Sequence, residues 1–292
     1  MRQINHILCP VDLSDISRHA IAHAVLMAHW YHAKITALHL YNPIVVPSTD
    51  FVVAGTPPAP LLTEDENREL RAQILHCFGS VEAGDLDVVI DNGHVANRVL
   101  ERALSLPADL IVMGTHGAGG FEHLLLGSVA EKVLRKATCP VMTVPPQARA
   151  TSKLPFKRLL CPVDFSEQSL TALEFAFSIA QESYAELTIL HVVDWPDEGS
   201  PPTVQYRQES ERDLEPKLAA LVPDAVRTWC QPTIRVERGK PYRTILEHAS
   251  ADTSDLIIMG VHGRNPLDLM LFGSTTNQVV RRATCPVLTL RA

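Results

Sequence analysis

Two glycine-containing segments with the same spacing are the part of this sequence best suited to chemistry. Both follow the pattern G-x2-G-x9-G-S, at residues 114–117 with 127–128 and at residues 260–263 with 273–274. Glycine lets a backbone turn sharply and approach a ligand closely. A Gly-Ser pair that opens a helix adds N–H groups, a hydroxyl and the positive end of the helix dipole, which together attract an anion. We call these segments the first and the second cradle, and we predict that each binds phosphate.

An aspartate accompanies each cradle elsewhere in the chain. Asp12 and Asp164 directly follow the tripeptide CPV at the end of a strand-like run. A carboxylate in that place can accept hydrogen bonds from ribose hydroxyls or help to hold a divalent cation. The next strand-like run ends at His39-Leu40 in one case and at His191-Val192 in the other. Backbone groups there could contact the edge of an adenine.

Histidines are the weaker candidates. His116 and His262 lie inside the cradles, and we interpret them as residues that orient the loop by hydrogen bonding to backbone rather than as catalysts. His19 and His23 have a spacing that suits metal binding on a helix, but no third ligand joins them, so we expect two exposed side chains. A P-loop is absent, and a dinucleotide fingerprint fails because Glu122 occupies its third glycine position.

The chain is an internal duplication. Residues 109–144 match residues 255–290 at 18 of 36 positions without a gap. The sequence therefore predicts two domains, at 1–147 and at 156–292, joined by a polar, proline-containing linker.

Each copy alternates short apolar runs with stretches of helical length. In the first copy we expect strands in the runs NHILCPV, AKITALHLY, LDVVID, ADLIVMG and PVMTV, with helices at about 15–32, 94–106 and 128–137. Such alternation is typical of a parallel sheet with helices on both faces. The predicted fold class is α/β, with two tandem Rossmann-like domains of five parallel strands each. Ligands in such folds lie beyond the carboxyl ends of the strands, which is where the cradles and aspartates fall.

Composition excludes several classes of protein. The net charge of −7 argues against a nucleic-acid-binding surface. No apolar stretch is long enough to span a membrane, and we expect no secretory signal, reduced cysteines and a cytoplasmic protein. The proline-rich segment 42–65 is expected to be a surface loop that acts as a lid or an interface, or is disordered.

On the repeated cradles and the paired aspartates, the chain resembles a tandem universal stress protein of the ATP-binding subclass, whose domains have the adenine nucleotide alpha hydrolase-like fold. The resemblance covers nearly the whole chain. It implies that ATP binds with Mg²⁺, which would contact Asp12 and Asp164. The cofactor-binding residues that it implies in the first copy are Pro10, Asp12, Leu40, Gly114, His116, Gly117, Gly127, Ser128 and Val129. Those in the second copy are Pro162, Asp164, Val192, Gly260, His262, Gly263, Gly273, Ser274 and Thr275.

The resemblance implies a nucleotide-binding regulatory protein of the stress response, and the alternative is an enzyme that slowly hydrolyses ATP or transfers a nucleotidyl group. Ala118 and Arg264 differ at the position after the second glycine, which leaves the relative affinity of the two sites open.

Each copy ends in an apolar strand, 140–144 and 286–290, that should form a sheet edge. We therefore expect these two strands to pair within one chain as a pseudo-dimer; whole chains could pair further as a homodimer.

Overall fold

A computed structural model describes residues 4–41, 62–79, 81, 85–116, 126–148, 156–194, 211–263 and 273–291. The strands of the first half are β1 (His6–Val11), β2 (Lys34–Tyr41), β3 (Leu86–Asn92), β4 (Leu110–Gly114) and β5 (Val141–Val144). Those of the second half are β6 (Arg158–Pro162), β7 (Glu186–Asp194), β8 (Thr233–Gly239), β9 (Leu256–Gly260) and β10 (Val287–Leu290). The helices are α1 (Asp15–Tyr31), α2 (Glu64–Phe78), α3 (Val95–Ser105), α4 (Ser128–Lys136), α5 (Glu167–Ser183), α6 (Glu211–Ala220), α7 (Asp224–Arg227), α8 (Pro241–Ala251) and α9 (Ser274–Arg282).

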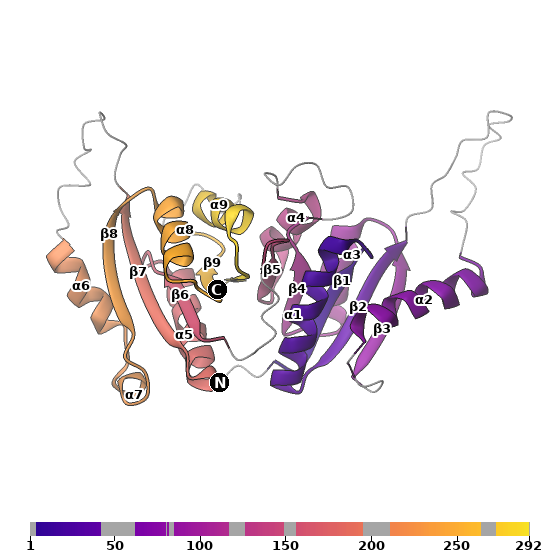
Figure 1. Cartoon of the computed structure of the whole chain (residues 1–292). Coiled ribbons are helices and arrows are strands. Elements are labelled where there is room, and N and C mark those ends of the chain that lie inside the picture. The colour runs from indigo at the N-terminus through magenta and orange to yellow at the C-terminus, as the bar shows by residue number, and fades with distance from the viewer. Residues whose placement is uncertain are drawn as a thin grey trace, which may run out of the picture.

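All the strands in the described part of the chain belong to one ten-stranded sheet in the order β3-β2-β1-β4-β5-β10-β9-β6-β7-β8 (Figure 1). The strands within each half are parallel, and only the contact between the halves is antiparallel. Buried residues of α1, α2, α5 and α6 cover one face, and those of α3, α4, α8 and α9 cover the other. The predicted α/β fold of two tandem Rossmann-like halves is confirmed. None of the described helices is long and apolar enough to cross a membrane.

The start of α2 falls within the segment that the sequence analysis treated as a loop. Thr63 caps this helix, and its hydroxyl and the Glu66 carboxylate form a reciprocal capping box. The helix therefore begins at Glu64, so its first two residues, Glu64 and Asp65, fall within the expected loop. Residues 42–61, which carry the rest of that prediction, lie outside the described part of the chain.

In each half, the aspartate before the fourth strand hydrogen-bonds to the start of the first strand. The Oδ2 atom of Asp109 accepts hydrogen bonds from the backbone N–H groups of Asn5 and His6, at 2.8 and 3.0 Å. Asp255 does the same for Lys157 and Arg158, at 2.8 and 2.9 Å. The duplication thus extends to individual hydrogen bonds.

The final strands of the two halves form a central strand pair, β5 with β10. Met142 lies opposite Leu288, and Thr143 lies opposite Val287. The hydroxyl of Thr143 donates to the Val287 carbonyl at 3.2 Å, and Thr289 donates to Val141 at the same distance. These reciprocal contacts are the pattern expected of a two-fold arrangement. The predicted pairing of the two terminal strands within one chain is confirmed.

Both hydrophobic clusters cross the central strand pair, so the two halves share their core. Phe156, at the end of the linker, is 1% exposed and packs edge-on against Trp30 of α1, with ring centroids 6.1 Å apart. The neighbouring Tyr31 hydrogen-bonds to Glu182 of α5. Burial first, and then the charge and hydrogen bond of Glu182, raise the pKa of the Tyr31 phenol, which therefore stays neutral.

Because of this shared core, we expect Leu288→Ala to destabilise both halves together. Leu288 is 1% exposed, and such truncations cost about 2–5 kcal/mol in free energy of unfolding. Urea titration combined with hydrogen exchange of segments from β1 and β6 would measure the loss in each half. Leu104→Ala is the matched control, because Leu104 is 64% exposed and its loss should change stability by about 0.5 kcal/mol at most. A loss confined to the second half would contradict the shared core.

Candidate functional site

A strained turn positions Asp12 at the end of β1. Leu13, the next residue, has a φ of 60°, in the left-handed region that non-glycine residues seldom adopt. Ser14 then caps α1: its hydroxyl accepts the N–H of Ser17 at 3.2 Å and donates to Asp12 Oδ1 at 2.6 Å. The backbone N–H of Ser14 donates to the same oxygen at 3.1 Å. One serine therefore both starts the helix and orients the carboxylate.

The second half repeats this turn. Phe165 has a φ of 64°, and Ser166 caps α5. The Ser166 hydroxyl donates to Asp164 Oδ1 at 2.6 Å, and its N–H donates at 3.0 Å. Backbone strain often occurs at functional sites, and these two residues lie directly beside the candidate aspartates.

A histidine from the adjacent strand fixes the residue before each aspartate. His39 Nδ1 hydrogen-bonds to the Val11 carbonyl at 2.9 Å, and His191 Nδ1 hydrogen-bonds to the Val163 carbonyl at 2.7 Å. From the sequence, these histidines were predicted only to lie beside a backbone contact to adenine. A histidine at the same place in two mainly apolar strands was the signal that could have revealed their role.

The glycines of the cradles allow backbone segments to pack closely. Gly127 donates its N–H to the Thr115 carbonyl at 2.9 Å, and Gly273 donates to the Val261 carbonyl at 3.2 Å. A Cβ atom at Gly127 would lie 3.1 Å from that carbonyl oxygen, and one at Gly273 would lie 2.9 Å from its counterpart. Neither glycine has a positive φ. The glycine before each helix is therefore required by crowding between loop and strand end rather than by an unusual turn.

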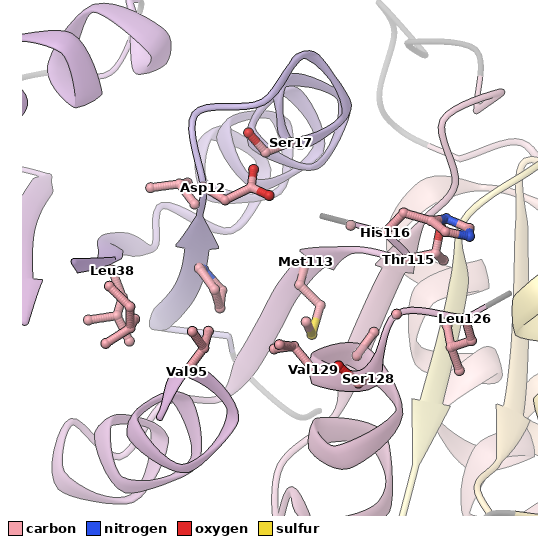
Figure 2. A pocket seen from close by; sticks show the side chains of 16 residues that line it. Asp12, Ser17, Leu38, Val95, Met113, Thr115, His116, Leu126, Ser128 and Val129 are labelled. Carbon is pink, nitrogen blue, oxygen red and sulfur yellow. The ribbon is translucent and has the colours of Figure 1, made fainter. Parts of the chain in front are cut away.

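A cavity of about 440 Å³ lies at the carboxyl ends of β1 and β4 (Figure 2). That volume falls within the range of about 300–1,000 Å³ common for small-molecule sites. In Figure 2, Asp12 and Ser17 lie on the β1–α1 side, whereas Ser128 and Val129 lie opposite them at the start of α4. The strand order reverses between β1 and β4, so the cavity occupies the switch point of the first half.

The structure brings the predicted residues of the first half together. The ones that line the cavity are Pro10, Asp12, Leu40, Gly114, His116, Gly127, Ser128 and Val129. Gly117 lies outside the described residues. The lining also includes residues that the sequence analysis did not assign to the site, namely Val11, Ser17, Leu38, Val95, Met113, Thr115, Leu126 and Ala130. Most are apolar, and no sequence motif separates them from ordinary core residues.

The predicted residues of the second half occupy the equivalent strand ends and helix start. Pro162 ends β6 and Asp164 follows two residues later, Val192 lies near the end of β7, and Gly260 ends β9. Gly273 is the N-cap of α9, which Ser274 and Thr275 begin. His262 and Gly263 lie in the loop after β9, where a Cβ at Gly263 would be 2.6 Å from Asp164 Oδ2.

His116 and His23 differ from what the sequence predicted. His116 Nδ1 lies 2.9 Å from the hydroxyl of Thr115, so its partner there is a side chain and not the expected backbone. His23 was expected to be exposed, but it is 1% exposed and bonds to the His19 carbonyl at 2.8 Å. Burial lowers the pKa of His23, which favours the neutral ring. Among the residues that the structure describes, no group of three or more His, Cys, Asp or Glu side chains could hold a metal ion.

Cysteine chemistry does not contribute to the first site. Cys9 precedes Pro10 in β1 and is fully buried. Burial raises the pKa of its thiol to about 12, so the thiol is protonated at neutral pH and is a poor nucleophile. Cys161 is equally buried in β6, and its pKa is raised for the same reason.

Comparison with known proteins places both halves in one family. The model of the universal stress protein family matches residues 3–145 and 155–291. A universal stress protein of Mycolicibacterium smegmatis is 30% identical over 299 residues, covering 98% of this chain and 96% of that protein. One of Mycobacterium tuberculosis is 25% identical over 307 residues, covering 99% and 98%. The crystal structure of a universal stress protein from Archaeoglobus fulgidus has 23% identity and a TM-score of 0.73 over 99% of each chain, a likeness of fold.

Because Ser14 both caps α1 and orients Asp12, we expect Ser14→Ala to lower the free energy of unfolding by about 1 kcal/mol, the usual effect of losing such a cap. Ser105→Ala is the control, since that hydroxyl only donates to a carbonyl in the last turn of α3. Denaturant titration of both variants would measure the difference. Equal stability of the two variants would show that Ser14 does not cap the helix in solution.

Proposed function

The chain belongs to the universal stress protein family, and from that premise we propose that each half binds ATP or a related adenine nucleotide with Mg²⁺. In this proposal nucleotide occupancy sets the state of a regulatory protein of the stress response. The observation that carries it is the cavity of the first half, where an aspartate and a helix N-terminus face each other across a strand-order switch point. The repeat of the same turn and cradle at the second half supports a second site.

One end of the cavity suits a flat apolar group. Leu38 and Val95 lie together at the end away from His116 (Figure 2). Leu40 and Met113 also line the cavity. Apolar walls with few polar groups are typical of sites that take a base or another planar ring. We therefore assign this end to the adenine.

The start of α4 suits an anion. The N-cap Gly127 has no side chain to accept the first N–H groups of the helix, and Ser128 adds an exposed hydroxyl. Free N–H groups and the helix dipole stabilise a phosphate in such a place. The close approach of Gly127 to Thr115 holds this helix start beside the end of β4.

A Mg²⁺ ion fits this arrangement because the Asp12 carboxylate and the phosphates of a nucleotide could coordinate it together. Mg²⁺ usually binds through one or two carboxylates together with the phosphates of a nucleotide. Asp12 supplies such a carboxylate, oriented by Ser14 at 2.6 Å. The ion would neutralise phosphate charge beside that carboxylate.

Binding rather than rapid turnover is the activity that the cavity supports. Its titratable lining residues, among those described, are Asp12 and His116. Asp12 Oδ1 accepts two hydrogen bonds from Ser14, and His116 Nδ1 is bonded to the Thr115 hydroxyl. Each side chain thus has one atom bonded to a neighbouring residue, while His116 Nε2 is buried without a hydrogen-bond partner among the described residues. We propose that these groups position the nucleotide rather than activate a water.

We expect Asp12→Asn and Asp164→Asn each to weaken Mg-ATP binding at one of two sites by about tenfold to a hundredfold, because each removes a charged ligand. Asn keeps the oxygen that accepts from the N-cap serine, so the turn should persist. Asp15→Asn is the matched control: it removes the same charge three residues away, from a side chain that is 91% exposed. Calorimetric titration and mass spectrometry of co-purifying nucleotide would test this. The absence of nucleotide by both methods would refute the proposal.

We also expect ATP turnover by the purified protein to be far below about 1 per second, the lower end of typical enzyme rates. A coupled phosphate-release assay with excess Mg-ATP would measure it. A variant that carries both Asp12→Asn and Asp164→Asn serves as the background control for contaminating ATPases, because each half has its own site. Turnover at typical enzyme rates that this double substitution abolishes would favour the enzyme.

A further inference from the structure

The loop of the second cradle is hydrogen-bonded to helix α5. Gln168, in the first turn of α5, accepts the backbone N–H of His262 through Oε1 at 2.7 Å. The helix and the strand end also pack closely, because a Cβ at Gly260 would lie 3.0 Å from the backbone carbon and from the Cβ of Gln168. This bond joins residues 94 positions apart and fixes the loop directly after β9.

The equivalent residue in the first half cannot make this bond. Ile16 occupies the place of Gln168, four residues after the aspartate in both halves. Its Cγ2 atom lies 3.9 Å from where a Cβ on Gly114 would be, so it also contacts the strand end, though less closely. An aliphatic side chain accepts no hydrogen bond, so α1 offers no side-chain acceptor at this place to the N–H of His116.

Two further contacts hold the second loop against its surroundings. A Cβ at Gly263 would lie 2.6 Å from Asp164 Oδ2, so the loop backbone is close to that carboxylate. Arg291 Nη2 lies 3.5 Å from His262 Nε2, whereas the equivalent position in the first half is Pro145. In agreement with these contacts, Asp164 is partly buried while Asp12 is exposed.

We propose that Gln168 determines a difference between the two nucleotide sites, making the second half the weaker one. This inference rests on the proposed function. Backbone N–H groups of the cradle are the donors that a phosphate would use, and Gln168 already occupies the N–H of His262. A nucleotide must displace the carboxamide or bind without that donor. A single neutral hydrogen bond corresponds to a difference in affinity of about threefold to tenfold.

The bond itself is tested without nucleotide. Gln168→Met keeps an unbranched side chain of similar length on α5 but removes the acceptor. We expect amide hydrogen exchange at His262 to become faster in this variant. Gln168→Glu retains an acceptor oxygen and should restore the protection. Equal protection of His262 in all three proteins would overturn the proposal, and unchanged exchange elsewhere in α5 would show that Gln168→Met folds normally.

The consequence for binding is tested in the intact chain by titrating with Mg-ATP and following exchange in segments 110–116 and 256–263, which report on the two halves separately. We expect half-saturation of the second half at a concentration about threefold to tenfold higher than that of the first. Gln168→Met should lower the Mg-ATP concentration that half-saturates the second half. The reciprocal Ile16→Gln should raise the concentration that half-saturates the first half by a similar factor. If nucleotide protects both segments but neither substitution moves its midpoint, Gln168 has no such role and the proposed function stands. If nucleotide protects neither segment, both proposals fail.

Discussion

The antiparallel pairing of β5 with β10 is the interaction on which the rest of the structure depends. Each half is a small parallel sheet whose last strand would otherwise present an unpaired apolar edge. Pairing these edges produces one sheet of ten strands and joins the two cores, with Met142 and Leu288 at its centre. The reciprocal bonds of Thr143 and Thr289 fix the register. The two cradles then occupy related places on either side of the same strand pair.

Within each half, the candidate site depends on crowding of the backbone at the strand ends. A Cβ on the glycine before α4 or α9 would lie 3.1 or 2.9 Å from a backbone oxygen just after the preceding strand, closer than an ordinary contact. In the turns after β1 and β6, Leu13 and Phe165 have left-handed backbone conformations. Asp12 then faces the cavity of the first half, and Asp164 faces the loop after β9. The N-cap serines and the strand histidines stabilise these turns from both sides. The geometry is therefore set by short-range contacts that both halves retain.

Most of the fold followed from patterns that are local in sequence. Apolar runs of strand length, helical stretches between them and the exact spacing of the repeat predicted the sheet and the pairing of its two halves. The cradle and aspartate positions were predictable for the same reason, since strand ends of a parallel sheet converge. The burial of His23 was not, because it depends on which face of α1 the sheet covers. The start of α2 was missed although Thr63 and Glu66 formed a recognisable capping box.

Because the two halves belong to one polypeptide, substitutions in them arise independently, unlike those in a homodimer. In a homodimer of single domains, every substitution appears in both sites at once, so a change that harms one harms the other. In this chain the position held by Ile16 in one half and by Gln168 in the other mutates independently. Selection can therefore preserve one site while the other drifts toward a new affinity, ligand or signal.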